Sequence, residues 1–326
     1  MSPHLRRRGV AVLVAALVAT GCQDDPPRAD VDRPPASTDS TASTSTTTVP
    51  APTEAPTTTA PPVVDVHSLR PPAPAGDPAG LAAQLADAER TLRDGGADEL
   101  ATAKAALAHQ VAYRQLGAHP EWEAEVLARL PPELRRPAEL NAAARREFRG
   151  MHRTLSPTLP AWRIVAPEPA DVLLAAYREA EAAFGIPWKY LAAVNLVETG
   201  FGRIRGTSTA GAQGPMQFLP ATWAAYGAGG DIEDTHDAIM GAARYLAANN
   251  GAADIDHALY RYNHSHRYVR GVRFYADLIV EHPRAFLAYY HWGIWYLSDQ
   301  GEEYLPVGYD EAAPVPVQEY RARGGR

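Results

Sequence analysis

The stretch from Gln23 to about Gly76 limits where this chain can fold, because its composition cannot support a packed core. It consists mainly of Pro, Thr, Ser and Ala, as in the run STDSTASTSTTTVPAPTEAPTTTAPP, and it holds few large apolar residues. Such a segment cannot bury enough apolar surface to offset the entropy lost on ordering. We expect residues 23–76 to be a disordered, partly polyproline-like linker, and a folded body after it.

The residues before this linker are typical of an export signal. Three arginines at positions 6–8 precede an apolar run, residues 10–19, that is too short to span a bilayer comfortably. The run ends in Ala19-Thr-Gly-Cys22, which resembles a bacterial lipoprotein box, and Cys22 is the only cysteine of the chain. The resemblance implies a lipoprotein signal peptide at residues 1–22, lipidation of Cys22 and an extracytoplasmic protein anchored to the cell membrane. An ordinary cleaved signal peptide and an uncleaved anchor are the alternatives, and both still export the protein.

The charge of the chain argues against nucleic acid as a partner. The formal net charge is −7 and the sequence pI is about 5.9. A nucleic-acid-binding protein usually shows a basic face, because it must neutralise phosphates. We therefore expect no nucleic acid among the partners.

Apolar residues recur at helical spacing through the body, which predicts a mainly α fold. A possible short β-hairpin around Asp299-Gln300-Gly301 is the exception, and no sustained strand alternation precedes residue 285. The helical stripes consist of Leu81, Leu85, Ala88 and Leu92; Leu100, Leu107 and Val111; Leu140, Ala144, Phe148 and Met151; Leu173, Tyr177, Ala180 and Phe184; Ile239, Ala242, Ala243 and Leu246; and Val269, Val272, Ala276 and Ile279.

One acidic residue lies on the apolar side of a predicted helix. Pro187 suits the first turn of a helix that runs through LAAVNLVE and stops at Gly200. Leu191, Val194 and Glu198 share one stripe of it. Burial and the negative end of the helix would both raise the pKa of the Glu198 carboxyl, as a general acid at neutral pH requires. A structural Glu whose head reaches solvent remains the alternative at this point.

Two later segments suit a ligand with many hydroxyl and amide groups. The loop from Gly206 to Gly214 consists of small residues, which allow a close approach to the backbone. Gln217 follows and offers both donor and acceptor groups. Further on, the run Tyr260-Arg-Tyr-Asn-His264 carries aromatic rings with hydroxyls, which can stack on a sugar or bond a catalytic acid.

In these three blocks the chain resembles the lytic transglycosylases of bacterial cell walls. The blocks are Glu198-Thr-Gly-Phe-Gly202, the stretch from Gly211 to Thr222 (GAQGPMQFLPAT), and the pair Tyr262-Asn263. They cover roughly residues 185–280. The resemblance implies a lysozyme-like helical catalytic domain, with peptidoglycan glycan strands as the partner and no cofactor.

The same resemblance assigns roles to the matched residues. Glu198 takes the place of the catalytic acid/base. The positions matched to substrate binding are Thr199, Gly214, Met216, Gln217, Tyr262 and Asn263. Thr199 stands where a Ser often bonds the catalytic Glu, and Tyr262 matches a Tyr near that Glu.

The resemblance implies cleavage of the bond between N-acetylmuramic acid (MurNAc) and N-acetylglucosamine (GlcNAc) with one carboxylate. The sugar's own C6 hydroxyl attacks and leaves a 1,6-anhydro end, whereas lysozyme-type hydrolases use two carboxylates. The acids from Asp231 to Asp237 are expected to solvate a loop and cap a helix, and we expect no calcium or other metal there. His257, His264 and His266 are expected to be a surface cluster. A muramidase acting on the same bond, and a non-catalytic glycan-binding lipoprotein, are the alternatives.

The predicted organisation after the linker has three parts. Residues 77–165 form an N-terminal helical region, residues 166–285 form the catalytic domain, and residues 286–326 form a C-terminal extension. The short connections favour packing of the N-terminal helices on the catalytic core, and a separate module is the alternative. No protein partner can be predicted from the sequence.

Overall fold

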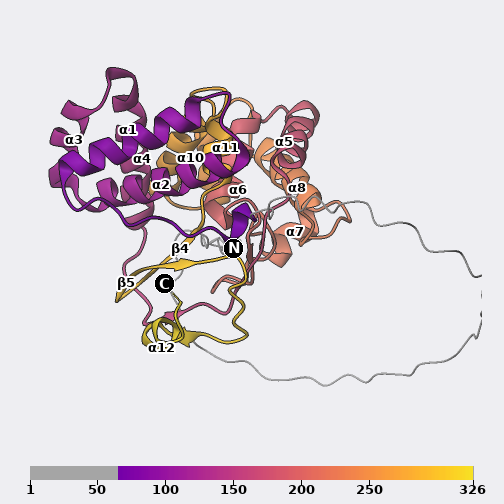
Figure 1. Ribbon diagram of the computed structural model, residues 1–326. Helices are drawn as coiled ribbons and strands as arrows, with labels where there is room; N and C mark the ends of the chain where they lie inside the picture. Colours follow the sequence, from indigo (N-terminus) through magenta and orange to yellow (C-terminus); the bar gives the residue numbers. More distant parts are fainter. Residues whose placement is uncertain (1–64, 326) are drawn as a thin grey trace, which may run out of the picture. The chain divides into compact units, whose positions relative to one another are not determined.

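The computed structural model describes residues 65–325, shown in colour in Figure 1. The predicted signal peptide, Cys22 and the linker up to residue 64 lie outside the described residues. No helix among residues 65–325 is both long and apolar enough to cross a membrane.

The N-terminal helices form a small bundle, in which the first two helices start at a capping Asp and the fourth starts at a proline. They are α1 (Pro78–Arg93), α2 (Glu99–Ala118), α3 (Glu123–Arg129) and α4 (Pro132–Arg149), with short 3-10 turns η1 (Val66–Ser68) and η2 (Pro120–Trp122). The side chains of Asp77 and Asp98 accept backbone N–H bonds in the first turns of α1 and α2. The leucines of the first predicted stripe are buried, α1 packs on α2 and α3, and α2 packs in turn on α4.

This bundle shares its core with the helices that follow. α4 packs along α10 (His266–Ile279), and one continuous cluster of buried residues runs from Leu81 to Trp292. The other helices of this part are α5 (Ala170–Phe184), α6 (Trp188–Thr199), α7 (Pro220–Tyr226), α8 (Thr235–Ala248), α9 (Ile255–Tyr262) and α11 (Ala285–Tyr290). The prediction of a mainly α fold with packed N-terminal helices is confirmed.

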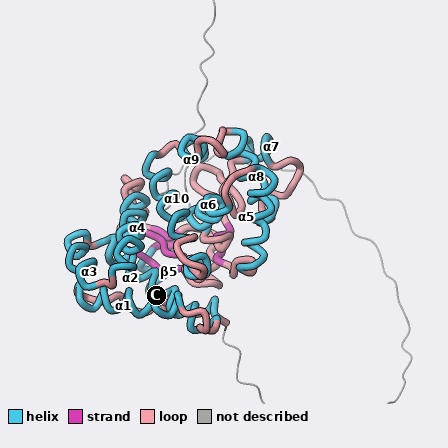
Figure 2. Tube along the Cα trace, turned by 90° about the horizontal axis from the view of Figure 1, so that it is seen from above, coloured by secondary structure: helices cyan, strands magenta, loops and turns pink. Residues whose placement is uncertain are grey.

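Helix α6 lies at the centre of this arrangement. Figure 2 shows it between α10 on one side and α5 and α8 on the other, and it packs on all three. Every residue from Leu191 to Thr199 is buried. A helix that is buried on all faces is apolar all round, so a charged residue within it needs a specific reason.

The strands are short and join segments that are far apart in the sequence. The predicted C-terminal hairpin is present as β4 (Ile294–Ser298) and β5 (Gly301–Leu305), with Asp299 and Gln300 between them. β1 (Thr158–Leu159) pairs with β6 (Val315–Pro316), and β2 (Arg163–Ile164) pairs with β3 (Ile204–Arg205). The two-residue strands before residue 285 are too short to produce an alternating pattern, so they could not be predicted from the sequence.

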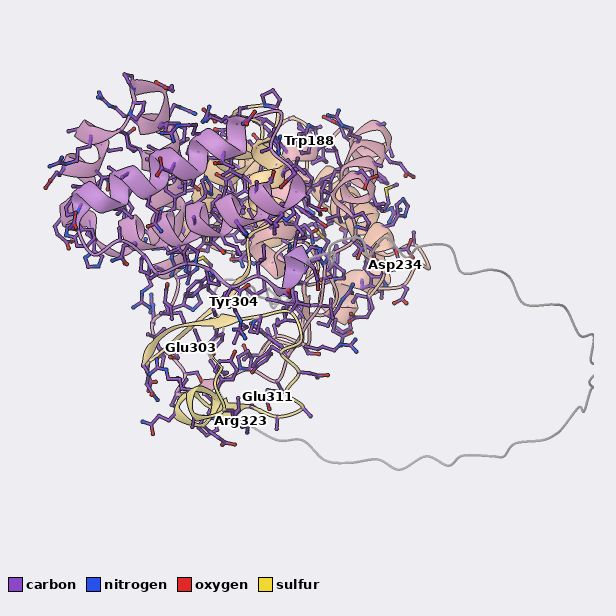
Figure 3. All side chains as sticks on the ribbon, viewed as in Figure 1. Trp188, Asp234, Glu303, Tyr304, Glu311 and Arg323 are labelled. Atoms are coloured by element: carbon purple, nitrogen blue, oxygen red, sulfur yellow. The ribbon has the colours of Figure 1, made fainter. Side chains whose placement is uncertain are left out.

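The C-terminal segment forms a second apolar cluster with residues 159–164. Trp162, Ile164, Ile294, Tyr309 and Tyr320, the last in α12 (Val317–Ala322), are among its buried members. Figure 3 labels Tyr304 and Glu303 on the hairpin and Glu311 and Arg323 near α12. Arg323 Nη1 donates to Glu311 Oε1 at 2.9 Å. The segment before α5 and the end of the described chain are therefore held together in one layer beside the helices.

Candidate active site

Glu198 is carried into the protein interior by the last turn of α6. Gly200 ends this helix in the left-handed conformation, with φ 59°, which a glycine adopts without strain. Glu198 is only 2% exposed, and the Tyr268 hydroxyl donates a hydrogen bond to its Oε1 at 2.8 Å. A buried carboxylate needs such donors, because removal from water is costly for a charge.

Two tyrosines lie in parallel beside this carboxylate. The rings of Tyr262 and Tyr268 are 6.5 Å apart with an interplanar angle of 1°. Burial and the charge of Glu198 raise the pKa of both hydroxyls well above 10, so both stay protonated and act as donors. The Tyr262 hydroxyl donates to the backbone oxygen of Met216 at 2.6 Å.

The tyrosine that bonds Glu198 Oε1 was not predicted from the sequence. The resemblance pointed to Tyr262, whose hydroxyl bonds the loop of Met216. Tyr268 lies four residues before Val272, on the same face of α10, and it is fully buried. Its position at the start of that apolar stripe, near the matched pair Tyr262-Asn263, was the available signal.

Thr199 links the end of α6 to the loop that contains Met216 and Gln217. Its hydroxyl donates to the Pro215 oxygen at 2.5 Å and accepts the Gly202 N–H at 2.9 Å. Asn195 Nδ2 also donates to the Pro215 oxygen, at 2.8 Å. The side chain of Thr199 is fully buried and directed at this loop, so the structure gives this predicted substrate-binding residue a role in joining two parts of the site.

The loop itself is held in a tight turn by residues with unusual backbone angles. Gly214 has φ 72°, and a Cβ at this position would lie 1.8 Å from the backbone oxygen of Ile232. Gln217 also has a positive φ, 51°, and its Nε2 donates to the Gly214 oxygen at 3.1 Å. The Met216 side chain, which the resemblance matched to substrate binding, is fully buried here. Its backbone oxygen, held by Tyr262, is the part of Met216 that joins the site.

Two buried polar atoms in this region have no hydrogen-bond partner among residues 65–325. They are the acceptor Gln217 Oε1 and the donor Asn263 Nδ2, and both side chains are almost completely buried. Leaving such atoms unpaired costs free energy, and they are rare in folded proteins. Gln217 and Tyr262 also line one small pocket, together with Phe218, Leu219, Thr222 and Tyr245.

The acidic residues after this loop are engaged in local structure. Asp234, labelled in Figure 3, caps α8 by accepting the Asp237 N–H at 2.9 Å. Asp237 accepts the Asp231 N–H, and Asp231 accepts the Glu233 N–H, each at 2.9 Å. Asp234, His236 and Asp237 are also the group among residues 65–325 whose ligand atoms lie close enough for one ion. Both aspartates of this group also accept a backbone N–H, Asp234 through Oδ1 and Asp237 through Oδ2.

The histidines near the Tyr262-Asn263 pair pack against an aromatic ring. His266 stacks on Tyr260 with ring centroids 4.6 Å apart, and His264 meets the same ring edge-on at 5.6 Å. They are not in the one group described above that could hold an ion.

Comparison with known proteins gives one family match. Residues 175–274 match the model of the transglycosylase SLT domain. This range contains Glu198, the loop around Gly214, the Tyr262-Asn263 pair and Tyr268. No curated protein and no solved structure matches the chain. Residues 175–274 therefore form a transglycosylase SLT domain, the domain of lytic transglycosylases of lysozyme-like type, which cleave the glycan strands of peptidoglycan.

Proposed function

We propose that Glu198 is the single catalytic acid/base of this enzyme, which cleaves the MurNAc–GlcNAc bond and leaves 1,6-anhydro-MurNAc ends. The observation that carries the proposal is the buried Glu198 carboxyl, bonded by the Tyr268 hydroxyl, inside the matched segment. A carboxyl held in a low-dielectric site by a neutral donor is suited to proton transfer, because its charge is poorly stabilised by solvent.

The proposed reaction uses this carboxyl twice. Glu198 first gives its proton to the glycosidic oxygen, so that GlcNAc leaves as an alcohol while the acetamido group of MurNAc stabilises the positive centre. The C6 hydroxyl of the same MurNAc then bonds to C1, and its proton returns to Glu198. No water is consumed. The attacking group is already part of the substrate, so no second carboxylate is needed as a nucleophile.

The acidic residues of the neighbouring loop support the use of one carboxylate. Asp231, Asp234 and Asp237 each accept a backbone N–H in the loop or at the start of α8. A side chain with such a structural task is a poor candidate for activating water. Glu233 is the remaining acid of this loop: its half-exposed carboxylate lies 3.9 Å from Arg205, and hydrolysis with two carboxylates, which would make the enzyme a muramidase, would have to use it.

The unpaired atoms of Gln217 and Asn263 support recognition of acetamido groups. An acetamido group presents one N–H donor and one carbonyl acceptor. Gln217 Oε1 needs a donor and Asn263 Nδ2 needs an acceptor. We propose that substrate binding satisfies both atoms, which would favour sugars that carry N-acetyl groups over plain sugars.

The domain family acts on the cell wall, so the action of this enzyme is extracytoplasmic. We further propose, from the segment that ends in Cys22, that a lipid on this cysteine anchors the protein to the membrane. Cells that express Cys22→Ser should release the protein into the soluble extracytoplasmic fraction, whereas the natural chain should stay with membranes. Equal membrane binding of both would contradict the anchor.

The catalytic proposal is tested by digesting purified peptidoglycan and identifying the products by mass spectrometry. The natural chain should release fragments with anhydro ends, which are lighter than reducing ends by one water. Glu198→Gln should release none, while Glu233→Gln, which alters a half-exposed carboxylate of the nearby loop, should behave as the natural chain. Reducing ends would establish a muramidase, and activity in Glu198→Gln would overturn the assignment of Glu198.

A further inference from the structure

A buried arginine donates a hydrogen bond to the residue that ends α6. Arg203 is 4% exposed, and its Nη1 donates to the Gly200 oxygen at 2.9 Å. Its Nη2 donates to the Tyr290 oxygen at 2.6 Å, and the guanidinium lies over the Tyr290 ring, 5.4 Å from the centroid. One side chain therefore joins the residue that ends α6 to the end of α11.

This arginine is buried at a considerable cost. Burial lowers the pKa of Arg203 to about 10, although Tyr290 and Tyr304 act in the opposite direction. No ion pair found among residues 65–325 includes it, so its charge is stabilised by carbonyl oxygens and an aromatic ring. An unpaired buried cation stabilises a fold less well than an apolar residue of similar size would. A role beyond stability is therefore expected for it.

The place that Arg203 fixes is the turn that aims the carboxyl of Glu198. Glu198 lies two residues before Gly200, in the last turn of α6, where helices fray most easily. On the same side, a Cβ at Gly200 would lie 2.5 Å from Cδ1 of Ile294, so the first residue of β4 closes directly over this turn. Tyr290 and Ile294 both lie beyond residue 274, where the family match ends.

We propose that Arg203 is a positioning residue for Glu198, acting by fixing the last turn of α6 against residues 290–294. This inference rests on the proposed role of Glu198 as the acid/base. The guanidinium suits the task because it donates in two fixed directions at once, whereas an ammonium group on a flexible stem does not. Arg203 touches no reacting atom, and its effect is on the angle at which the carboxyl meets the Tyr268 hydroxyl and the substrate.

The test measures kcat and KM separately on peptidoglycan glycan strands, with the full chain and three variants. Arg203→Met should lower kcat about ten- to a hundredfold, since small misplacements of a catalytic group have effects of this order. KM should stay within about twofold, because the substrate contacts are elsewhere. Arg203→Lys should fall between the two. Arg244→Met is the matched control: Arg244 also donates to a backbone oxygen, that of Tyr226, and lies over Phe184 at 5.2 Å, and its kcat should be unchanged.

Thermal unfolding of each variant gives the folded fraction, by which kcat is corrected. A corrected kcat of Arg203→Met within about twofold of the natural chain would overturn the inference. A rise in KM by the same factor as the fall in kcat would also overturn it, since Arg203 would then affect substrate binding as much as the chemical step. A loss of folding in both Arg203 variants would overturn it as well, since Arg203 would then serve the fold alone. If the natural chain releases no anhydro ends, the proposed function fails instead, before any variant is compared.

Discussion

Glu89 offers a sharp test of how the N-terminal helices are held to the rest of the protein. It lies on α1, is 3% exposed and receives hydrogen bonds from three directions. Tyr113 Oη donates to its Oε1 at 2.9 Å, and Arg93 Nε donates to its Oε2 at 3.0 Å. His109 Nε2 lies 3.3 Å from Oε1, and the indole N–H of Trp292 donates to His109 Nδ1 at 3.0 Å. The network thus links α1 and α2 to the segment after α11.

The contribution of this carboxylate to stability follows from its pKa. Burial alone would raise the pKa of Glu89, but the hydrogen bonds from His109 and Tyr113 and the charge of Arg93 outweigh burial and lower it from 4.5 to about 2. The folded state therefore holds the ionised form more strongly than the unfolded state does. The stabilisation is fully present above pH 4.5 and is lost as the pH falls towards 2. Its full size is about 3 kcal/mol, of which about 2 kcal/mol is lost between pH 6 and pH 3.

The assay is urea unfolding followed by tryptophan fluorescence, at pH 6 and at pH 3, for the natural chain and Glu89→Gln. Other carboxylates titrate alike in both proteins and cancel. The difference in unfolding free energy between the two should shrink by about 2 kcal/mol on going to pH 3. Glu125→Gln is the control, because Glu125 also pairs with an arginine four residues on but is about half exposed, and its difference should be small at both pH values. A Glu89→Gln difference that does not change with pH would refute the reasoning.

Three other variants probe the active site. Tyr268→Phe keeps the ring but removes the bond to Glu198 Oε1, so kcat should fall about tenfold with KM unchanged, while Tyr260→Phe keeps full activity; equal rates in all three proteins would contradict this. Gly214→Ala should lower the free energy of unfolding, measured with urea, by at least about 2 kcal/mol, because its Cβ would meet a backbone oxygen. Gly211→Ala, with φ 82° and open space around the Cβ, should lower it by about 1 kcal/mol, and similar losses in both variants would count against the clash. Thr199→Val should lose about 1–3 kcal/mol by leaving the Gly202 N–H unpaired, and Thr199→Ser should restore it; a stable Thr199→Val would show that the loop needs no such fastening.

The sequence was sufficient to predict what repeats along the chain or stands close together in it. Apolar residues at helical spacing predicted the mainly α fold, since a helix buries one face every three or four residues. The turn signal at Asp299-Gln300-Gly301 predicted the C-terminal hairpin. Gly200 and Pro187 marked the two ends of α6, because each has a local effect on the backbone.

The features that were missed depend on contacts between distant segments. The bond from Tyr268 to Glu198 joins residues seventy positions apart, and a tyrosine at the start of an apolar stripe looks like an ordinary core residue. The burial of Arg203 depends on the backbone oxygen of Tyr290, and any residue type supplies such an oxygen. The two-residue strands β1 and β2 exist only through their partners near residues 315 and 204. Patterns within a short stretch of sequence do not identify these partners.

The Tyr268 bond makes the two oxygens of Glu198 unequal. A free carboxylate is symmetric, and either oxygen can carry a proton. Here the Tyr268 hydroxyl keeps its own hydrogen and directs it at Oε1, which is therefore committed as an acceptor. While Tyr268 donates to Oε1, protonation of Glu198 is favoured on Oε2. A single phenol, seventy residues further along the chain, thus favours proton exchange with a bound sugar from one side of the carboxyl group.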